Sequence, residues 1–308
     1  MKILIVASFN KDSFSPFIIE QANALSKQGC EIDYLGIQGK GFLGYLKNYS
    51  ALRQRIKQYK PDIVHAHYGL SGLFANFQRK IPVVTTYHGS DINDKNVIMF
   101  SRMAMGLSAW NIFVSQKICE IAQPKRKYSI CPCGIDFTDL QLTSRTEARK
   151  KLGFPKEKKY VLFSGAFDNT VKNFSLAKAS VEELQDDSVE LIELKGYSRE
   201  EVILLMCAAD VLLMTSFSEG SPQVIKEALA CGCPIVSVDV GDVKERTEGL
   251  DGCFVASTYD AKELAGLLRH ALSFEGKTKG RERLAADGFD NQKVATKLLN
   301  VYEKVLQL

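Results

Sequence analysis

Short apolar runs alternate with amphipathic stretches along the whole chain. In the first half, the runs that we predict as strands lie at 2–7, 32–34, 62–65, 82–85 and 111–115. In the second half they lie at 160–165, 188–194, 210–214, 234–238 and 252–255. Patterns with a helical period fall between these runs, and such alternation is typical of βαβ units. The pattern therefore predicts an α/β fold whose parallel sheets are covered by helices on both faces.

The size and charge of the chain narrow the classes of protein to which it can belong. Its 308 residues suffice for two domains, since a domain usually has about 100–200 residues. The formal net charge of +4 is well below that of a dedicated nucleic-acid binder, so no nucleic-acid partner is predicted. The chain starts with a short strand-like run and has no apolar stretch of membrane-spanning length, and we therefore expect a cytoplasmic protein.

The eight cysteines are scattered through helix and strand patterns, which fits reduced thiols better than a disulfide framework. Cys131 and Cys133 form one C-x-C pair, and Cys231 and Cys233 form another. This spacing differs from the C-x2-C form of common zinc sites, and each pair adjoins a predicted buried strand. We therefore predict no metal site.

One segment of the second half combines a strand end, a helix start and two carboxylates. The strand at 210–214 leads into a loop, and Ser221 followed by Pro222 is typical of a helix N-cap and the first helical residue. Free N–H groups at a helix N-terminus suit a phosphate or diphosphate. Glu219 before the helix and Glu227 within it are too far apart to act on one atom, so we interpret them as acceptors for hydroxyl groups at two points of an elongated ligand.

This segment resembles the signature E-G-x-P-x-x-x-x-E of the retaining glycosyltransferases of family 4, which have the GT-B fold. The resemblance implies two Rossmann-like domains that face each other across a cleft. It also implies that Glu219 contacts the sugar of a nucleotide-sugar donor and that Glu227 contacts the ribose. The residues between them, which the resemblance assigns to donor binding, are Gly220, Ser221, Pro222 and Gln223.

Further motifs of the family occur in the family's order. An H-G-x-D segment follows the strand at 82–85, and the resemblance implies that His88 bonds the donor sugar while Gly89 lets the backbone approach the ligand. A K-N pair, Lys172 and Asn173, corresponds to the cation that neutralises the donor diphosphate. The Arg that usually helps is absent between Gly165 and Lys172, which leaves helix dipoles or an Arg from elsewhere.

Two more features follow from the resemblance. Gly196 and Tyr197 lie where the nucleotide base is usually recognised. The segment 130–136 corresponds to the family's I-P-N-G-I-D run, with Cys133 in place of the usual Asn. Because that run normally closes the first domain, we predict domains at 1–140 and 141–289, with a hinge at 137–144 and a final helix at about 290–308 that returns to the first domain.

The acceptor side of the first domain is less defined. Asn10 and Lys11 in the first loop could contact an acceptor or the donor phosphates, although solvated loop residues are the simpler interpretation. The strand at 62–65 ends in two histidines on one face, of which we expect one, His65, in the core and His67 at the acceptor.

A basic stretch at 40–60 carries six Lys and Arg among aromatic residues and no carboxylate. It is either a contact with anionic lipid at the inner face of the membrane or an ordinary solvated helix face. Both interpretations stay open.

The resemblance implies a retaining, metal-independent hexosyltransferase that uses a UDP- or GDP-linked sugar and no other cofactor. Its acceptor would be a hydroxyl of a glycan or lipid-linked molecule, by analogy in bacterial surface polysaccharide synthesis. His88, Glu219 and Lys172 are the predicted catalytic residues. Two alternatives remain open: a GT-B nucleotide-sugar epimerase and a non-catalytic nucleotide-sugar binding subunit.

Overall fold

The computed structural model describes residues 1–9, 13–125, 127–138, 140 and 142–307, and it divides into two compact units. Unit 1 comprises Met1–Gly134 and Phe289–Leu308, and unit 2 comprises Ile135–Gly288. The division therefore comes a few residues before the predicted boundary at 140. Residues 139 and 141 of the predicted hinge lie outside the described part of the chain.

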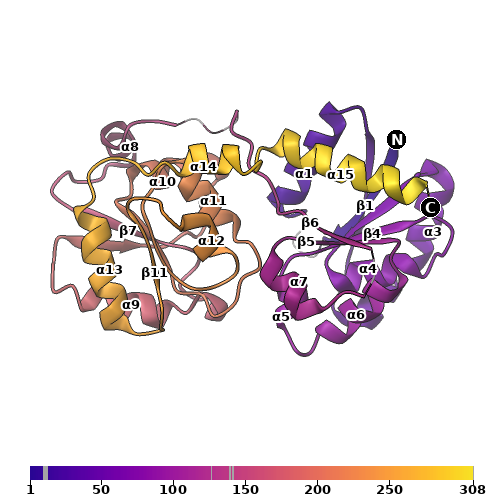
Figure 1. Cartoon of the computed structure of the whole chain (residues 1–308), viewed down its shortest axis with the longest axis horizontal. Helices are drawn as coiled ribbons and strands as arrows, with labels where there is room; N and C mark the ends of the chain where they lie inside the picture. The colour runs from indigo at the N-terminus through magenta and orange to yellow at the C-terminus, as the bar shows by residue number, and fades with distance from the viewer. Residues whose placement is uncertain (10–12, 126, 139, 141, 308) are drawn as a thin grey trace. The chain divides into compact units, whose positions relative to one another are not determined.

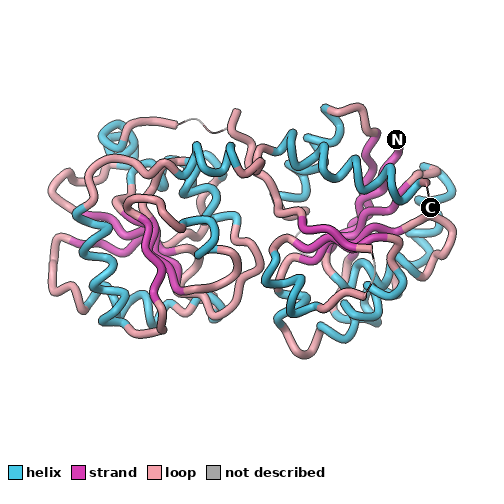
Figure 2. Tube along the Cα trace, viewed as in Figure 1, coloured by secondary structure: helices cyan, strands magenta, loops and turns pink. Residues whose placement is uncertain are grey.

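Unit 1 is built on a parallel sheet with the strand order β2-β1-β3-β4-β5-β6 within the described residues. Figure 2 shows this sheet as a layer of magenta strands with cyan helices on both sides. Its strands are β1 (Lys2–Ser8), β2 (Glu31–Ile37), β3 (Ile63–His67), β4 (Val83–Tyr87), β5 (Trp110–Phe113) and β6 (Tyr128–Ile130). The α/β prediction is thus confirmed. The strand expected beside Cys131 is β6, for which no bounds were predicted, and its residues are half-buried or exposed rather than buried.

The helices of unit 1 connect these strands and cover both faces of the sheet (Figure 1). They are α1 (Pro16–Lys27), α2 (Gly41–Leu46), α3 (Tyr49–Tyr59), α4 (Gly69–Asn76), α5 (Ser90–Asn93), α6 (Ile98–Leu107), α7 (Gln116–Ala122) and α15 (Asn291–Leu306). Helix α1 begins at Pro16, whose fixed φ suits the first turn of a helix. Ser15 is its N-cap residue, but it makes no side-chain capping bond.

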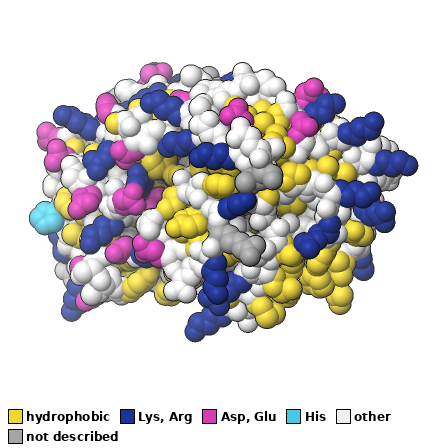
Figure 3. All heavy atoms as spheres, turned by 45° about the vertical axis from the view of Figure 1, so that its right-hand side comes forward, with side chains coloured by type: hydrophobic (Ala, Val, Ile, Leu, Met, Phe, Trp, Pro, Cys, Tyr) yellow, Lys and Arg dark blue, Asp and Glu magenta, His cyan; other side chains and the backbone are white. Residues whose placement is uncertain are grey.

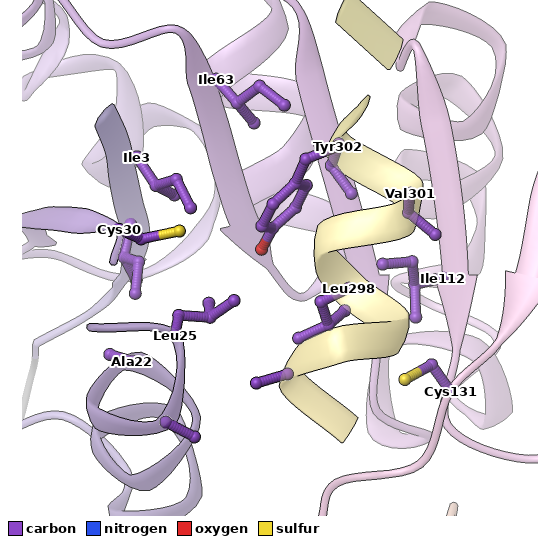
Figure 4. Close-up of a cluster of buried hydrophobic side chains, with 14 of the residues drawn as sticks. Ile3, Ala22, Leu25, Cys30, Ile63, Ile112, Cys131, Leu298, Val301 and Tyr302 are labelled. Carbon is purple, nitrogen blue, oxygen red and sulfur yellow. The ribbon is translucent and has the colours of Figure 1, made fainter. Parts of the chain in front are cut away.

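The last helix of the chain belongs to the core of the first unit, as the resemblance implied. Helix α15 packs beside α1, and its buried face includes Leu298, Val301 and Tyr302. Figure 4 shows Leu298 and Tyr302 among side chains of β1, β3 and α1, such as Ile3 and Ile63. Residues at the two ends of the sequence therefore share one hydrophobic core.

Unit 2 repeats the architecture around a parallel sheet with the order β11-β10-β9-β7-β8 within the described residues. Its strands are β7 (Lys159–Phe163), β8 (Val189–Ile192), β9 (Val211–Met214), β10 (Ile235–Val238) and β11 (Cys253–Ala256). Its helices are α8 (Arg145–Leu152), η1 (Thr170–Lys172), α9 (Phe174–Glu182), α10 (Arg199–Ala208), α11 (Gln223–Ala230), α12 (Val243–Thr247), α13 (Ala261–Ser273) and α14 (Gly280–Ala286). Each predicted strand is present to within a few residues.

The carboxyl ends of the strands carry the predicted motifs in both units. In unit 1 the loop after β4 holds the H-G-x-D segment, and in unit 2 the loop after β9 holds the E-G-S-P segment. Ligands of open α/β sheets bind at these ends. No described helix combines the length and apolar character needed to cross a membrane.

Candidate functional site

The loop between β9 and α11 carries the E-G-S-P sequence of unit 2. Helix α11 begins at Gln223, and its N-cap is Pro222 in an extended conformation with φ −66° and ψ 123°. The prediction that Ser221 is the cap and Pro222 the first helical residue is therefore wrong by one position. Ser221 does not cap the helix because its hydroxyl donates instead to Asp242 Oδ2 at 2.8 Å, in the loop after β10.

Lys172 and Glu219 form an ion pair in this unit. Lys172 Nζ lies 2.7 Å from Glu219 Oε1, and the two side chains are only 18% and 16% exposed. The fold thus brings together two of the residues that the sequence predicted to be catalytic. Because an ammonium group has three N–H donors and a carboxylate has about four acceptor sites, each partner retains capacity for a ligand.

Backbone and side-chain bonds explain why these two distant segments meet. Thr215, directly after β9, donates its hydroxyl to the carbonyl oxygens of Lys172 at 2.9 Å and Asn173 at 3.0 Å. The N–H of Phe217 donates to the carbonyl of Val171 at 2.9 Å. Asn173, with φ of 54°, provides the left-handed turn between η1 and α9. The K-N loop is therefore held against the E-G-S-P loop.

A glycine makes room for the lysine. A Cβ atom on Gly165, just after β7, would lie 2.9 Å from Lys172 Cγ and 3.1 Å from its Cε. A larger residue at this position would displace the Lys172 side chain. Gly241 acts in the same way on the other side, because a Cβ there would lie 2.9 Å from the carbonyl oxygen of Gly220 and 3.2 Å from Glu219 Cβ.

Glu227 is not a surface residue, although it lies on a helix. It is only 7% exposed, and its Oε1 accepts a hydrogen bond from the Nη1 of Arg199, the first residue of α10. Sequence reasoning did not single out Arg199. Gly196 and Tyr197 belong to the loop directly before α10, so the predicted base-recognition residues are close in sequence to the arginine that contacts Glu227.

A fully buried cation supports the start of α11. Lys226 has no exposed surface, and its Nζ donates to Gln223 Oε1 at 2.7 Å and to the carbonyl of Ser221 at 3.4 Å. Burial raises the pKa of nearby Asp242, while the positive charge of Lys226 opposes that shift. Sequence reasoning missed Lys226, because a lysine next to a glutamate on a helix is typical of a solvated face and gives no local signal of burial.

The H-G-x-D loop of unit 1 is organised by Asp91. Its carboxylate accepts hydrogen bonds from the backbone N–H groups of His88 and Gly89, each at 3.0 Å, and of Gly69 at 2.9 Å. Burial raises the pKa of Asp91 to about 6, against the opposing effect of these three donors. Gly89 has φ of 117°, which favours glycine, so its presence in the motif has a structural reason. Asp91 therefore fixes the backbone around His88.

Three histidines lie in a row: His88 in this loop, and His67 and His65 in strand β3. His65 and His67 stack with their ring centroids 4.5 Å apart, and His67 Nδ1 lies 3.0 Å from His88 Nε2. His65 bonds Thr86 and Tyr302, as expected of a core histidine. His67, which we predicted on the acceptor side, is fully buried, so any effect on a ligand passes through the half-buried His88.

A pocket of about 620 Å³ opens in unit 1 at the carboxyl ends of β1, β3 and β4. Tyr68 stands out in its wall, because its φ of 72° and ψ of 148° are rare outside glycine, and its ring lies 4.6 Å from that of His88. Asn10 and Lys11, the predicted acceptor-side residues of the first loop, lie outside the described residues. The pocket lining includes Ser8, Phe14, Tyr45, Tyr68, Ser90 and Asp94.

The cysteines of the described chain are free thiols, and nearly all are buried. The described residues contain no group of three or more His, Cys, Asp or Glu side chains that could hold a metal ion. Independence of a metal stays a prediction, because a substrate can itself supply ligands to a metal.

Comparison with known proteins places both units in one class. A family model described as Glycosyltransferase Family 4 matches residues 17–139, and one described as Glycosyl transferases group 1 matches residues 172–273. The chain is 30% identical over 225 residues to TuaC of Bacillus subtilis, named as a teichuronic acid biosynthesis glycosyltransferase; the match covers 63% of this chain and 58% of TuaC. It is 24% identical over 251 residues to the amylovoran biosynthesis glycosyltransferase AmsK of Erwinia amylovora, with 69% and 61% covered. The chain thus spans about three fifths of the length of these relatives.

Solved structures show the same fold. Sucrose-phosphate synthase of Thermosynechococcus elongatus has a TM-score of 0.84 at 17% identity, with 100% of this chain and 99% of that chain covered. HepE of Anabaena, in complex with UDP, has a TM-score of 0.75 at 18% identity, with 99% and 100% covered. Two parallel α/β units, with the last helix packed on the first unit, define this class as the GT-B proteins.

Within that class the chain belongs to glycosyltransferase family 4, the group 1 glycosyl transferases. The family that the motifs suggested is thereby confirmed.

Proposed function

We propose that the chain is a glycosyltransferase that moves a sugar from a nucleoside diphosphate sugar to a hydroxyl of a glycan or lipid-linked acceptor in bacterial polysaccharide synthesis. The single observation that carries the proposal is the constellation in unit 2: Lys172 pairs with Glu219 in the loop before α11, and the buried Glu227 within α11 contacts Arg199. The names of the relatives TuaC and AmsK support the bacterial polysaccharide as product.

The donor is proposed to bind at the E-G-S-P loop. Lys172 would donate to the diphosphate, and the N–H groups at the start of α11 add the positive pole of a helix. Glu219 would accept hydroxyl hydrogens of the sugar, and Glu227 those of the ribose. Gly196 and Tyr197 would contact the base. The structures of HepE with UDP and with UDP-glucose support a uridine nucleotide as the first candidate, and a guanosine nucleotide is the alternative.

The proposed reaction retains the configuration of the sugar and needs no metal. The bond between the anomeric carbon and the diphosphate oxygen breaks, and a bond from the acceptor oxygen to that carbon forms on the same face. The acceptor proton passes to the departing diphosphate. Lys172 stabilises the negative charge that grows on this leaving group, and such electrostatic stabilisation is commonly worth several kcal/mol of the barrier. His88 would hydrogen-bond a sugar hydroxyl.

The pocket of unit 1 is the proposed acceptor site. Its aromatic walls, which include Phe14, Tyr45 and Tyr68, suit the apolar faces of a sugar ring, and its serines suit the hydroxyl groups. A lipid-linked acceptor would present its sugar at a membrane surface. The proposed place of action is therefore the cytoplasm, with peripheral contact at the inner face of the membrane.

Exposed apolar residues support this membrane contact. Leu43 of α2 is 75% exposed, and Met99 and Met103 of α6 are 60% and 51% exposed. The two helices are neighbours, since Phe42 stacks on Phe100 at 5.9 Å. Figure 3 shows one face of the molecule on which hydrophobic side chains gather at the lower right, with Lys and Arg beside them. Exposed cations of the same two helices and their borders are Lys40, Lys47 and Arg102.

The basic helix α3 itself is better explained as a solvated helix. Leu52 and Ile56 are buried, Arg53 and Lys57 are exposed, and Arg55 pairs with Asp33 at 3.3 Å. The proposed lipid contact is therefore confined to α2, α6 and their neighbours, rather than the whole stretch 40–60. The proposed partner is an anionic lipid surface, because the exposed charges on α6 and on the residues that cap α2 are positive.

A thermal-shift screen with UDP, GDP, ADP and their sugars tests the donor site. A ligand at one hundred times its Kd stabilises the folded state by about 2.7 kcal/mol, so one nucleotide should raise the melting temperature clearly and the others should not. Glu227→Gln should weaken the effect of that nucleotide. Glu282→Gln, which changes an exposed carboxylate on α14, is the matched control and should leave it unchanged.

The transfer of sugar to an acceptor is tested with the nucleotide sugar that the thermal-shift screen identifies. Sugar should move to an acceptor in the wild type, and Glu219→Ala should abolish this. Unchanged transfer by Glu219→Ala would contradict the proposal and favour a mere binding role for this site. Conversion of the donor sugar without any acceptor would instead indicate an epimerase, a class that shares the fold.

A further inference from the structure

The histidine row of unit 1 contains a hydrogen bond whose direction can be worked out. His67 Nδ1 and His88 Nε2 lie 3.0 Å apart, so one of these two nitrogens carries the proton that they share. A neutral imidazole has one N–H and one bare nitrogen, and the bond that one nitrogen makes determines the state of the other. The direction of this bond therefore fixes the tautomers of both rings.

Both buried histidines behind His88 are neutral at physiological pH. Burial lowers the pKa of His67 well below its usual 6.5, and the neighbouring His65 and His88 act in the same direction. Burial also lowers the pKa of His65 to about 3. His67 therefore has one ring proton, which lies either on Nδ1 or on Nε2.

The surroundings of His67 decide between these positions. Its Nε2 has almost no exposed surface and finds no hydrogen-bond partner among the described residues. A proton on Nε2 would leave a buried donor without an acceptor, and orphaned donors are rarer in protein interiors than orphaned acceptors. A proton on Nδ1 instead makes the bond to His88 and leaves only a bare nitrogen unpaired. The second arrangement is favoured.

We propose that His67 is a positioning residue that fixes the tautomer of His88: His67 donates from Nδ1 to His88 Nε2, and His88 consequently carries its own ring proton on Nδ1. That second nitrogen of His88 faces Cys133 Sγ at 3.9 Å. Sulfur is a weak acceptor, so the oxygen of a ligand can replace it as the partner of this N–H.

The consequence for chemistry rests on the proposed function. His88 would act on a sugar hydroxyl as a hydrogen-bond donor through Nδ1, and Nε2 would be unavailable as a general base because His67 already occupies it. The rings of Phe17 and Tyr68 contact the His88 ring at a tilt, with centroids 4.8 Å and 4.6 Å away, and these contacts hold the His88 ring in this orientation.

The tautomers can be observed directly in the full chain. The sequence has only four histidines, so two-bond ¹H–¹⁵N correlation spectra of protein with ¹⁵N-labelled histidine are simple enough to assign by single substitutions. We expect His67 and His88 each to show a protonated Nδ1 and a bare Nε2. A proton on Nε2 of either ring, or a doubly protonated His88, would overturn the proposal.

A variant tests whether His67 is the cause. In His67→Phe the donor to His88 Nε2 is lost, and the Nε2 signal of His88 should shift towards the protonated form. His270→Gln, on the exposed end of α13, is the matched control and should leave the His88 spectrum unchanged. Trp110 fluorescence checks the folding of unit 1, and the wild-type spectrum decides the direction of the bond even where the variant does not fold.

A second readout replaces His88 by amide side chains, each of which mimics one of the two ring nitrogens of histidine. The amide nitrogen of Asn lies near the position of histidine Nδ1, and that of Gln lies near Nε2. His88→Asn should therefore keep at least tenfold more transfer activity than His88→Gln, and the reverse order would contradict the proposed donor. Absence of transfer in the wild type would remove the proposed function, while the spectra would still test the tautomer.

Discussion

At the scale of single residues, the site of unit 2 depends on where side chains are missing as much as on where they are present. Lys172 reaches Glu219 across the face of Gly165, and Gly241 lets the next loop approach Glu219 and Gly220. A Cβ atom at either position would come too close to the neighbouring atoms, so these contacts require glycine. The charged pair therefore depends on two glycines that contribute no side chain of their own.

Gly165→Ala should damage the site more than the fold. The new methyl group would meet Lys172 Cγ at 2.9 Å and push the ammonium away from Glu219. Loss of a hydrogen bond to a charged group costs about 1.5–3 kcal/mol, so the Kd of the nucleotide sugar should rise by about tenfold or more. Isothermal titration calorimetry measures this change.

Gly266→Ala is the matched control for that variant. Gly266 lies inside α13 with open space around its Cα, and alanine is the better helix former by up to about 1 kcal/mol. This control should bind the nucleotide sugar as the wild type does. Equal affinity of Gly165→Ala and the wild type would show that Lys172 does not contribute to binding.

The buried histidines give unit 1 a sensitivity to acid. The pKa of His65 is about 3 in the folded chain against 6.5 in the unfolded chain, because burial disfavours the charged ring. A depressed pKa contributes stability above pH 6.5 that is lost as the pH falls towards 3. His67 acts in the same direction, whereas Asp91, whose pKa burial raises to about 6, opposes it between about pH 6 and 4.

The free energy of unfolding of unit 1 should therefore fall between pH 7.5 and pH 5. One histidine contributes on the order of 2 kcal/mol to this fall, since each pH unit below 6.5 is worth about 1.4 kcal/mol per proton. Urea titrations followed by the fluorescence of Trp110, the only tryptophan, measure it. His65→Asn should show a shallower fall and His270→Gln the wild-type fall. A stability that rises on acidification would contradict this account.

At the scale of elements, α15 completes the first unit from the far end of the sequence. It buries Val294, Leu298, Val301 and Tyr302 in the cluster that also contains Ile3 of β1. Tyr302 adds a hydrogen bond to the sheet, because its hydroxyl lies 2.6 Å from Nδ1 of His65 in β3. The helix thus reaches the histidine row as well as the hydrophobic core.

Leu298→Ala should destabilise unit 1 by about 2–5 kcal/mol, because it removes a fully buried side chain and leaves a cavity between α15 and the sheet. Urea unfolding monitored at Trp110, which packs against the same cluster, gives the value. Lys297→Ala changes the exposed neighbour on the same helix and should alter stability by less than about 0.5 kcal/mol. Equal stability of the two variants would show that α15 does not hold the unit together.

At the scale of the whole molecule, the surface of unit 1 carries the proposed contact with lipid. Leu43→Glu should weaken binding to vesicles that contain anionic phosphatidylglycerol by about tenfold, because it replaces an exposed apolar side chain by a repelled charge. Co-sedimentation measures the bound fraction. Leu142→Glu, at an exposed leucine of unit 2, is the control. Equal binding of the wild type and Leu43→Glu would remove α2 from the contact.

The fold could be predicted almost completely from local patterns. Apolar runs of buried strands, the helical periods between them and the order of the motifs are all properties of neighbouring residues, so β1 and β9 were found without tertiary information. The bounds and the exposure of the three-residue strand β6 were not predicted, because its side chains are partly exposed and give no apolar run.

The sequence by itself determined the architecture, the family and the chemical groups at the strand ends, because these depend on residue type and spacing. Only the tertiary structure decided the partners. The Ser221 hydroxyl donates to Asp242 in the loop after β10 instead of capping α11. Arg199 at the start of α10 donates to Glu227, and the buried His67 lies within hydrogen-bonding distance of His88. These contacts join segments that are far apart along the chain, and no local pattern records which side chains packing will bring together.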